Sequence, residues 1–452
     1  MTTLGQTVFA PSIVSGPTPG IGHVRAFLNP LKFLRELAHR HPQIAYLGLG
    51  RRRDYLIFDA DLVGEALDLD EKTVSRCFNP RLRELMGHGV LSIHGTEHHE
   101  QRKRLKPLFF RSNLESYSPI MVRHGLAMTK QWKDGQTVEV VSAMLSVSFD
   151  IITDVLFGRS GEEAKALSRL SSRTIPISGR YGYIKRFVAA KFRHAKDPEV
   201  REMTSKLNSI LLPWIETSRS SSGKPRCPAI VHRLVEIHDG IFDEEQKSDR
   251  QTRDELISFL FAGHETTAMA VSWALWLVSQ DETAERGLQA EIDSVIGDSI
   301  PMIEHISRLK FTRAVLREAM RLYPPVWLVA RRTITDCQVG SREIPARSFL
   351  HISPYAIQRD ERYYDSPDEF RPGRFLVGPS AAARHKHAYI PFGGGSWRCM
   401  GDTFAQIEGV LLLACVVRNW RVKTLPGQNI TPQPLVSLRP KYGIKMSLHR
   451  RS

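Results

Sequence analysis

The residue best suited to metal chemistry is Cys399, which lies in a glycine-rich segment from Pro391 to Gly401. Three consecutive glycines before it leave the backbone free to adopt conformations that other residues avoid. An apolar helical pattern starts at Asp402, so backbone amides and the positive end of a helix dipole are available to the sulfur. Both favour the thiolate, the form of cysteine that binds metals. A phosphate-binding loop would require a following Gly-Lys-Ser/Thr, which is missing, and an ordinary buried cysteine is the alternative.

A second candidate is the segment from Ala262 to Thr267, which combines a glycine, an acid and two threonines inside a long helical pattern from Thr252 to Gln280. A capping-box pattern, Thr252 to Glu255, predicts where this helix begins. Glycine costs about 1 kcal/mol in a helix interior, so Gly263 needs a compensating reason. Close packing of a neighbouring helix is one reason, and room for a bound group is another.

Several charged residues have helical spacing. Glu318 and Arg321 are three apart on one helix face, and His98 and Arg102 are four apart. Pairs of this kind are common on protein surfaces, so the spacing alone does not assign them a role.

The cysteine segment resembles the haem-ligand signature of the cytochrome P450 monooxygenases. Phe392, Gly395, Cys399 and Gly401 match it, whereas Trp397 stands where the family has a basic residue. The resemblance implies haem b as the cofactor and Cys399 as the axial ligand of its iron, since thiolate ligation favours O–O cleavage. It also implies that an arginine in place of Trp397 would retain or tighten haem.

Further matches follow in the family's order. The resemblance implies that Glu318, Arg321 and Arg374 form a structural charge cluster that fixes the cysteine loop. It implies that Glu265 and Thr266 deliver protons to dioxygen, while His264 occupies a variable position and faces solvent or core. The remaining cofactor-binding residues implied by the resemblance are Ala262 and Gly263, which give the haem room, and the propionate partners His98, Arg102 and Arg331.

The elements that must position these residues are mostly helical, so we expect a mainly α fold with small, mainly antiparallel β sheets. The resemblance specifies the P450 triangular prism. Residues 1–16 are expected to be a flexible tail and residues 17–452 a single domain. Helices are predicted at Pro30–His39, Arg102–Phe110, Thr252–Gln280, Thr283–Ile296, Leu309–Leu322 and Asp402–Trp420, strands at Gln43–Leu49, Tyr55–Phe58, Phe349–Ile352 and Gly443–Leu448, and loops at Ser218–Arg226 and Asp239–Gln251.

Composition excludes several classes of protein. The 452 residues are 42% hydrophobic, which rules out disorder, and five dispersed cysteines indicate a reducing compartment. The N-terminus has no apolar run, and Val410–Val417 is shorter than the roughly 18 residues that cross a bilayer. We therefore expect a soluble, cytoplasmic monomer without a transmembrane anchor. The net charge of +15 favours contact with an acidic partner, and the charge alone leaves nucleic acid, an anionic membrane and an acidic protein as alternatives.

The resemblance implies a monooxygenase that receives electrons, ultimately from NAD(P)H, through a separate acidic ferredoxin or flavodoxin and its reductase. The substrate is an apolar small molecule of the terpenoid, steroid or fatty-acid class. A haem-thiolate isomerase, dehydratase or peroxygenase is the alternative, and a basic nucleic-acid-binding protein is a non-enzymatic one. Family position places the pocket at Pro80–His94, Phe259–His264, Val326–Ala330 and Leu435–Leu438, and a docking face at Lys103, Arg104, Lys106, Arg384 and Lys386.

Overall fold

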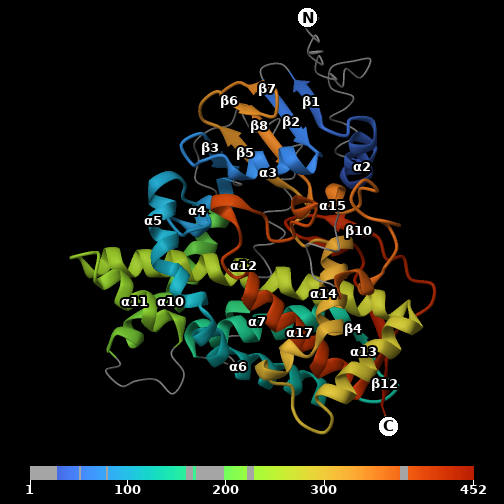
Figure 1. Cartoon of the computed structure of the whole chain (residues 1–452). Helices are drawn as coiled ribbons and strands as arrows, with labels where there is room; N and C mark the ends of the chain where they lie inside the picture. Colours follow the sequence, from blue (N-terminus) through green and yellow to red (C-terminus); the bar gives the residue numbers. More distant parts are fainter. Residues whose placement is uncertain are drawn as a thin grey trace, which may run out of the picture.

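The computed structural model describes residues 28–49, 52–77, 80–158, 166–168, 170, 198–220, 229–376 and 385–451. The expected tail at residues 1–16, Arg384 of the expected docking face and most of the predicted loop Ser218–Arg226 lie outside these ranges. Figure 1 shows β strands gathered at the N-terminal side of the molecule and a larger body of helices beneath them. The mainly α fold with small sheets is confirmed.

The main sheet has five strands in the order β1 (Ile44–Leu49), β2 (Arg52–Ile57), β8 (Phe349–Ile352), β5 (Val329–Thr333) and β3 (Val74–Arg76). The β2–β8 pair is parallel and the other pairs of this sheet are antiparallel. Inward-facing aliphatic residues such as Ile57 and Leu350 bury its inner face. Three of the predicted strands are confirmed in this sheet, at β1, β2 and β8, and the fourth is confirmed in another sheet as β12 (Lys445–Arg450). Strands β3 and β5 were not predicted.

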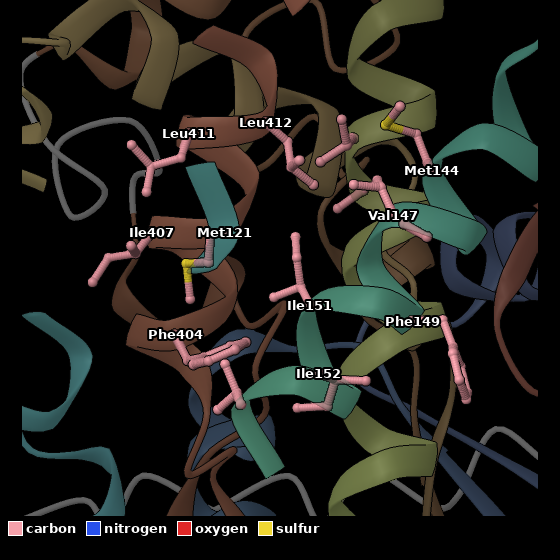
Figure 2. Close-up of a cluster of buried hydrophobic side chains, with 14 of the residues drawn as sticks. Met121, Met144, Val147, Phe149, Ile151, Ile152, Phe404, Ile407, Leu411 and Leu412 are labelled. Carbon is pink, nitrogen blue, oxygen red and sulfur yellow. The ribbon is translucent and has the colours of Figure 1, made fainter. Parts of the chain in front are cut away.

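The helical body is organised around α12 (Glu245–Ser279), which runs across the whole molecule in Figure 1. Helix α7 (Val140–Phe157) packs along it, and α17 (Asp402–Asn419) packs against both α12 and α6 (Arg111–Lys130). Figure 2 shows the side chains that join them, with Ile151 of α7 between α17 and α12. The core thus holds the helix that follows the cysteine loop directly against the helix that carries Thr266.

The start of α12 corrects two predictions. The helix begins at Glu245, so the predicted loop Asp239–Gln251 is wrong over its second half. Thr252 is not an N-cap, because its hydroxyl is hydrogen-bonded to Nδ1 of buried His238 at 2.8 Å. The residues of the capping-box pattern, Thr252 and Glu255, therefore lie inside the helix, and the Thr252 side chain makes a tertiary contact instead of a cap.

The predicted helix Arg102–Phe110 is also divided differently. Helix α5 covers Gly95–Leu105, and a 3₁₀ turn, η1, covers Lys106–Phe109. Pro107 explains the change, because proline lacks the amide hydrogen that a continuing α-helix requires.

The other elements complete the helical body and the small sheets. They are α2 (Pro30–Arg40), α3 (Ala60–Asp68), α4 (Pro80–Met86), α10 (Pro198–Ser220), α11 (Ile230–Asp239), α13 (Glu282–Val295), α14 (Lys310–Leu322), α15 (Pro354–Ile357), the 3₁₀ turns η3 (Ile303–Ser307), η4 (Pro372–Phe375), η5 (Lys386–Ala388) and η6 (Gly395–Trp397), and strands β4 (Thr137–Glu139), β6 (Cys337–Val339), β7 (Arg342–Ile344), β9 (Trp420–Thr424), β10 (Pro432–Pro434), β11 (Leu438–Pro440) and β12 (Lys445–Arg450).

Helix α7 is, within the described residues, the one helix long and apolar enough to cross a membrane, and 72% of it is buried inside the fold. The sequence prediction overlooked this helix because Asp150 and Asp154 interrupt its apolar run. Its contacts with α12 and α6 are those of a core helix.

Candidate functional site

The cysteine loop joins the sheet side of the molecule to α17. The Cys399 N–H donates to the carbonyl of Phe392 at 3.0 Å, which closes the loop into a narrow turn. Gly395 has φ +61°, and a Cβ built there would lie 1.8 Å from the carbonyl oxygen of Leu67. Only glycine fits at this position, since neither the conformation nor the space admits a side chain.

Cys399 itself is accessible to solvent, but the protein atoms around its sulfur raise the pKa of the thiol. The Gly401 N–H and the nearby charges of Arg102 and Arg76 act in the opposite direction. The amide donor expected from the sequence is therefore present, but its effect on the pKa is outweighed by the desolvation that the surrounding protein atoms cause. A metal ion would supply the positive charge that converts this thiol to a thiolate ligand.

A closed charge cluster supports this loop from α14. Glu318 accepts from Arg321 at 2.7 and 2.9 Å and from Arg374 at 3.0 Å. The other donors of Arg321 reach the carbonyls of Gln358, Pro367 and Glu369. The structure thus brings together the three residues that the sequence grouped, which we name the α14 charge cluster (Glu318, Arg321 and Arg374).

Gln358 links the α14 charge cluster to the cysteine loop, and the sequence analysis did not identify it. Its side-chain Oε1 accepts from the N–H of Ile390 at 3.0 Å, and its side-chain Nε2 donates to the carbonyls of Met320 and Arg321. Ile390 in turn accepts the N–H of Gly393 inside the loop. No local motif marks this glutamine, because its partners are far away in the sequence.

The segment Ala262–Thr267 of α12, which we expected to activate oxygen, presents its residues on two different faces of the helix. Thr266 is partly exposed and donates to the carbonyl of Ala262 at 2.8 Å, and Ala262 is itself exposed. A Cβ at Gly263 would lie 3.0 Å from Ile152 of α7. Helix packing, the alternative left open by the sequence, therefore accounts for Gly263, and Ala262 is the small residue on the accessible side.

Glu265 points away from Thr266 into a polar contact with the C-terminal hairpin. Its carboxylate accepts from Ser437 at 2.5 Å and from Arg439 Nε at 2.9 Å, and it is only 4% exposed. The adjacent His264 is buried, contacts Phe149 edge to face and is hydrogen-bonded through Nδ1 to the carbonyl of Leu260. His264 thus faces the core, one of the two positions expected for it.

The predicted propionate partners gather beside the cysteine loop. His98 is fully buried, its Nδ1 lies 2.7 Å from Glu71, and burial with nearby arginines lowers its pKa to about 3. Arg102 donates to the carbonyl of Arg398 at 2.5 Å, which places α5 against the loop. Arg331 stacks over the Trp397 ring at 4.4 Å. We name Arg76, His98, Arg102, Arg331 and Trp397 the basic cluster, because electrostatic coupling also joins the unpredicted Arg76 to it.

The basic cluster fits the carboxylates of haem. Three of its buried polar atoms, His98 Nε2, Arg331 Nε and Trp397 Nε1, have no hydrogen-bond partner among the described residues. Unpaired buried donors are costly unless a ligand satisfies them. A group with two carboxylates and an iron that binds thiolate matches these donors and the adjacent Cys399, so the residues present suit haem.

Known proteins support the same assignment. The family model "Cytochrome P450" matches residues 14–448. The chain is 30% identical to cyclooctatin synthase of Streptomyces melanosporofaciens, over 94% of this chain and 93% of that one. It is 28% identical to cyclooctat-9-en-7-ol 5-monooxygenase of the same organism, over 92% and 90% of the two chains.

The fold has a solved counterpart. The haem domain of cytochrome P450DA superposes with a TM-score of 0.80 at 22% identity and covers 96% of each chain. This similarity shows the fold. The family match over nearly the whole length, together with the relative named as a monooxygenase, shows that the chain belongs to the cytochrome P450 family and is a monooxygenase.

Proposed function

We propose that this P450 inserts one oxygen atom of O2 into an apolar terpenoid, in the cytoplasm and as a monomer. The observation that carries the proposal is the similarity, along more than nine-tenths of the chain, to relatives named for cyclooctatin synthesis and cyclooctat-9-en-7-ol oxygenation. Steroids and fatty acids, the other expected substrate classes, become the second choice. Membership in the family rules out the non-enzymatic alternative of a nucleic-acid-binding protein.

In this proposal Cys399 holds the haem iron and the basic cluster holds the haem carboxylates. When bound, haem supplies the activation of dioxygen. The hydroxyl of Thr266, on the accessible face of α12, holds its proton in a hydrogen bond to the Ala262 carbonyl. When it passes this proton on, it accepts another from solvent water, so the hydroxyl is restored. Glu265 reaches that face only after it leaves Arg439 and Ser437, so Arg439 controls whether the acid is available.

The first test is the reduced-CO difference spectrum of the wild type and of Cys399→Ser. The thiolate signature is expected in the wild type and should be lost in the variant, because serine cannot supply the axial sulfur. Cys415→Ser is the matched control, since Cys415 is buried in α17 within the helical core. A signature that persisted in Cys399→Ser would reject the ligand assignment.

The second test follows the fate of electrons and oxygen. The enzyme is supplied with cyclooctat-9-en-7-ol, NADH, ferredoxin and reductase under oxygen-18-labelled dioxygen, and labelled product is expected. Thr266→Ala should release peroxide instead of product while still binding substrate. Product formation from peroxide without NADH would favour the peroxygenase alternative, and an unchanged product yield per NADH in Thr266→Ala would reject the relay.

An acidic ferredoxin or flavodoxin with its reductase is the proposed electron source. Lys103, Arg104 and Lys106 are exposed beside Arg102, which contacts the cysteine loop through Arg398. Complementary charge accelerates association and is screened by salt. Charge reversal of these three residues to glutamate should slow reduction at low salt without altering substrate affinity. Equal rates at low and high salt in both proteins would contradict the docking face.

A further inference from the structure

The segment between α4 and α5 (Gly87–His94), which we name the α4–α5 loop, lies directly on α12. A Cβ built at Gly87 would overlap the carboxylate of Asp254, and one built at Gly89 would overlap the main-chain carbonyl of Asp254 and the hydroxyl of Ser258. Glycine is the residue that leaves room for such a close approach of two backbones. The two glycines therefore allow the loop to seat against the helix.

Two adjacent carboxyl groups of α12 accept main-chain hydrogens of the α4–α5 loop. The N–H of His88 donates to Asp254 Oδ2 at 2.7 Å, and the N–H of Val90 donates to Glu255 Oε2 at 3.0 Å. In the opposite direction, the side chain of Gln251 donates to the carbonyl of His88 at 3.1 Å. A single stretch of α12 thus holds the loop backbone by three hydrogen bonds.

Burial makes these hydrogen bonds important for the position of the loop. Asp254 is 2% exposed and Glu255 is 0% exposed. Burial raises the pKa of Asp254 and raises that of Glu255 to about 8. A buried acceptor that loses its donor bears the full cost of desolvation. Lifting the loop would remove a main-chain donor from each carboxyl group, so the two groups favour the seated position.

The same stretch of α12 also holds a second element. Arg253 donates through Nε to Asn208 Oδ1 of α10 at 2.8 Å, and its Nη1 contacts the carboxylate of Asp254. Helix α10 in turn packs against α4, which precedes the α4–α5 loop. The loop and α10 are therefore anchored at one place on α12, with Asp254 in contact with the partners of both.

The α4–α5 loop lies on the side of α12 that leads to the proposed reaction centre. It meets Asp254 and Ser258, and Ala262 and Thr266 follow them at intervals of four residues. Residues four apart are neighbours along one side of a helix. At 1.5 Å per residue, Thr266 is about 12 Å along the axis from Ser258. The loop is therefore close enough to cover one end of a substrate that reaches Thr266.

The α4–α5 loop also borders a cavity of about 410 Å³. Gly87, His88, Ser92 and Ile93 of the loop contribute to its lining, together with residues of α4 and α5. Packing on the cavity side does not fix the loop, because open space lies there. The hydrogen bonds to Asp254 and Glu255 consequently have the larger part in holding it.

We propose that Asp254 and Glu255 are positioning residues that hold the α4–α5 loop over the substrate and thereby set how tightly a large apolar molecule is enclosed. The inference rests on the proposed function and extends it to two residues that do not contact the reacting atoms. Binding of a terpenoid depends on the seated loop, because the loop covers one end of it. Binding of a small ligand to the haem iron does not.

Comparison of a large and a small ligand tests this proposal. Full-length, haem-loaded Glu255→Leu and Glu255→Gln are titrated with cyclooctat-9-en-7-ol, followed by the spin-state shift, and with imidazole, a small ligand of the haem iron. Leucine cannot accept the Val90 N–H, whereas glutamine keeps an acceptor oxygen. Glu255→Leu should weaken terpenoid binding about tenfold, as expected when a buried donor loses its acceptor. It should bind imidazole like the wild type, and Glu255→Gln should bind both ligands nearly normally.

Glu245→Gln is the matched control, since Glu245 is an exposed acid in the first turn of the same helix, and its partner Arg219 stays paired with Asp239. It should bind both ligands like the wild type. Equal weakening of both ligands in Glu255→Leu would show general damage to the fold and overturn the proposal. Wild-type affinity for the terpenoid in that variant would overturn it too.

A second variant and readout need no substrate. Gly89→Ala leaves both carboxyl groups unchanged but introduces a Cβ that overlaps the Asp254 carbonyl, so the loop must shift. Hydrogen exchange of the amides in residues 87–93 should be about tenfold faster in Glu255→Leu and in Gly89→Ala, whereas exchange in α14 should not change. Wild-type exchange of the loop in both variants would overturn the proposal.

Failure of the proposed function gives a different result. A wild-type enzyme without a spin-state shift on addition of cyclooctat-9-en-7-ol would reject the proposed substrate class. The exchange measurement would still decide whether Glu255 holds the α4–α5 loop, so the two failures are distinguishable.

Discussion

Arg321 and Arg331 are both buried, at 0% and 5% exposure, yet their surroundings are opposite. In the α14 charge cluster, Arg321 has a carboxylate and backbone carbonyls for all its donors. In the basic cluster, Arg331 faces another arginine and an indole and leaves its Nε unpaired. A buried arginine that the chain neutralises by itself is structural, whereas one that it leaves unpaired indicates a ligand from outside.

Removal of the acid from the α14 charge cluster should have the largest effect at neutral pH. Glu318→Gln keeps the shape of the side chain but leaves Arg321 and Arg374 buried without a counter-charge. The free energy of unfolding should fall by about 3–5 kcal/mol, the usual cost of breaking a buried ion pair. Urea denaturation measures it, with the exposed Glu282→Gln as the control.

If Glu318→Gln lowered the free energy of unfolding by less than about 1 kcal/mol, the contrast between the two clusters would be contradicted. Arg321 and Arg374 would then remain buried without a counter-charge as readily as the arginines of the basic cluster do. The two clusters would no longer differ in kind. Arg321 would need another compensating group.

Glu408 on α17 extends the comparison to a carboxyl group without a cation. It is fully buried beside Ser148 and Thr267, neither of its oxygens has a hydrogen-bond partner among the described residues, and burial raises its pKa from 4.5 to about 8. The folded chain therefore keeps a proton that the unfolded chain releases above pH 4.5. Stability is full below that pH and falls as the pH rises toward 8.

Glu408→Gln should flatten this slope, by up to roughly 5 kcal/mol between pH 4.5 and pH 8 at about 1.4 kcal/mol per pKa unit. Urea midpoints measured at several pH values test the expectation. Glu255 is buried with a pKa of about 8 and should leave a residual slope of the same sign. A slope equal to that of the wild type would show that Glu408 is ionised or hydrated in the fold.

The substitution Trp397→Arg tests the contrast between the two clusters at a single residue. We expect it to have the smallest of the three effects predicted here. The sequence predicted that a cation there would retain or tighten haem. From the stacking geometry we predict the opposite, because the new cation would replace the ring that Arg331 stacks on and would add charge beside Arg76. Haem retention should weaken on the order of tenfold, about the worth of a desolvated cation–π contact.

The rate of haem transfer from the loaded enzyme to apomyoglobin measures retention in this variant. Trp397→Phe, which keeps an aromatic ring but not the N–H, should lie closer to the wild type. Tighter haem in Trp397→Arg would restore the sequence-based expectation. It would also show that the basic cluster accepts a further positive charge.

The amino-acid sequence was sufficient for features whose residues are neighbours along the chain. The cysteine loop, the Glu318–Arg321 pair and the helix carrying Thr266 were recognisable because local spacing determines a turn, a helix face or a helix. Arg374 was placed by family resemblance, and its contact with Glu318 agrees with that placement. The start of α12 was misjudged, since tertiary contacts extend a helix beyond its local signals.

Only the tertiary structure revealed the partners that come from distant segments. Arg439 reaches Glu265, Gln358 reaches Ile390, and the register of β3 on β5 sets Arg76 opposite Arg331. No short motif encodes these contacts, because each depends on which elements the hydrophobic core brings side by side. Local sequence thus determined which groups could do the chemistry, whereas long-range packing decided which charges are neutralised within the chain and which remain for a ligand.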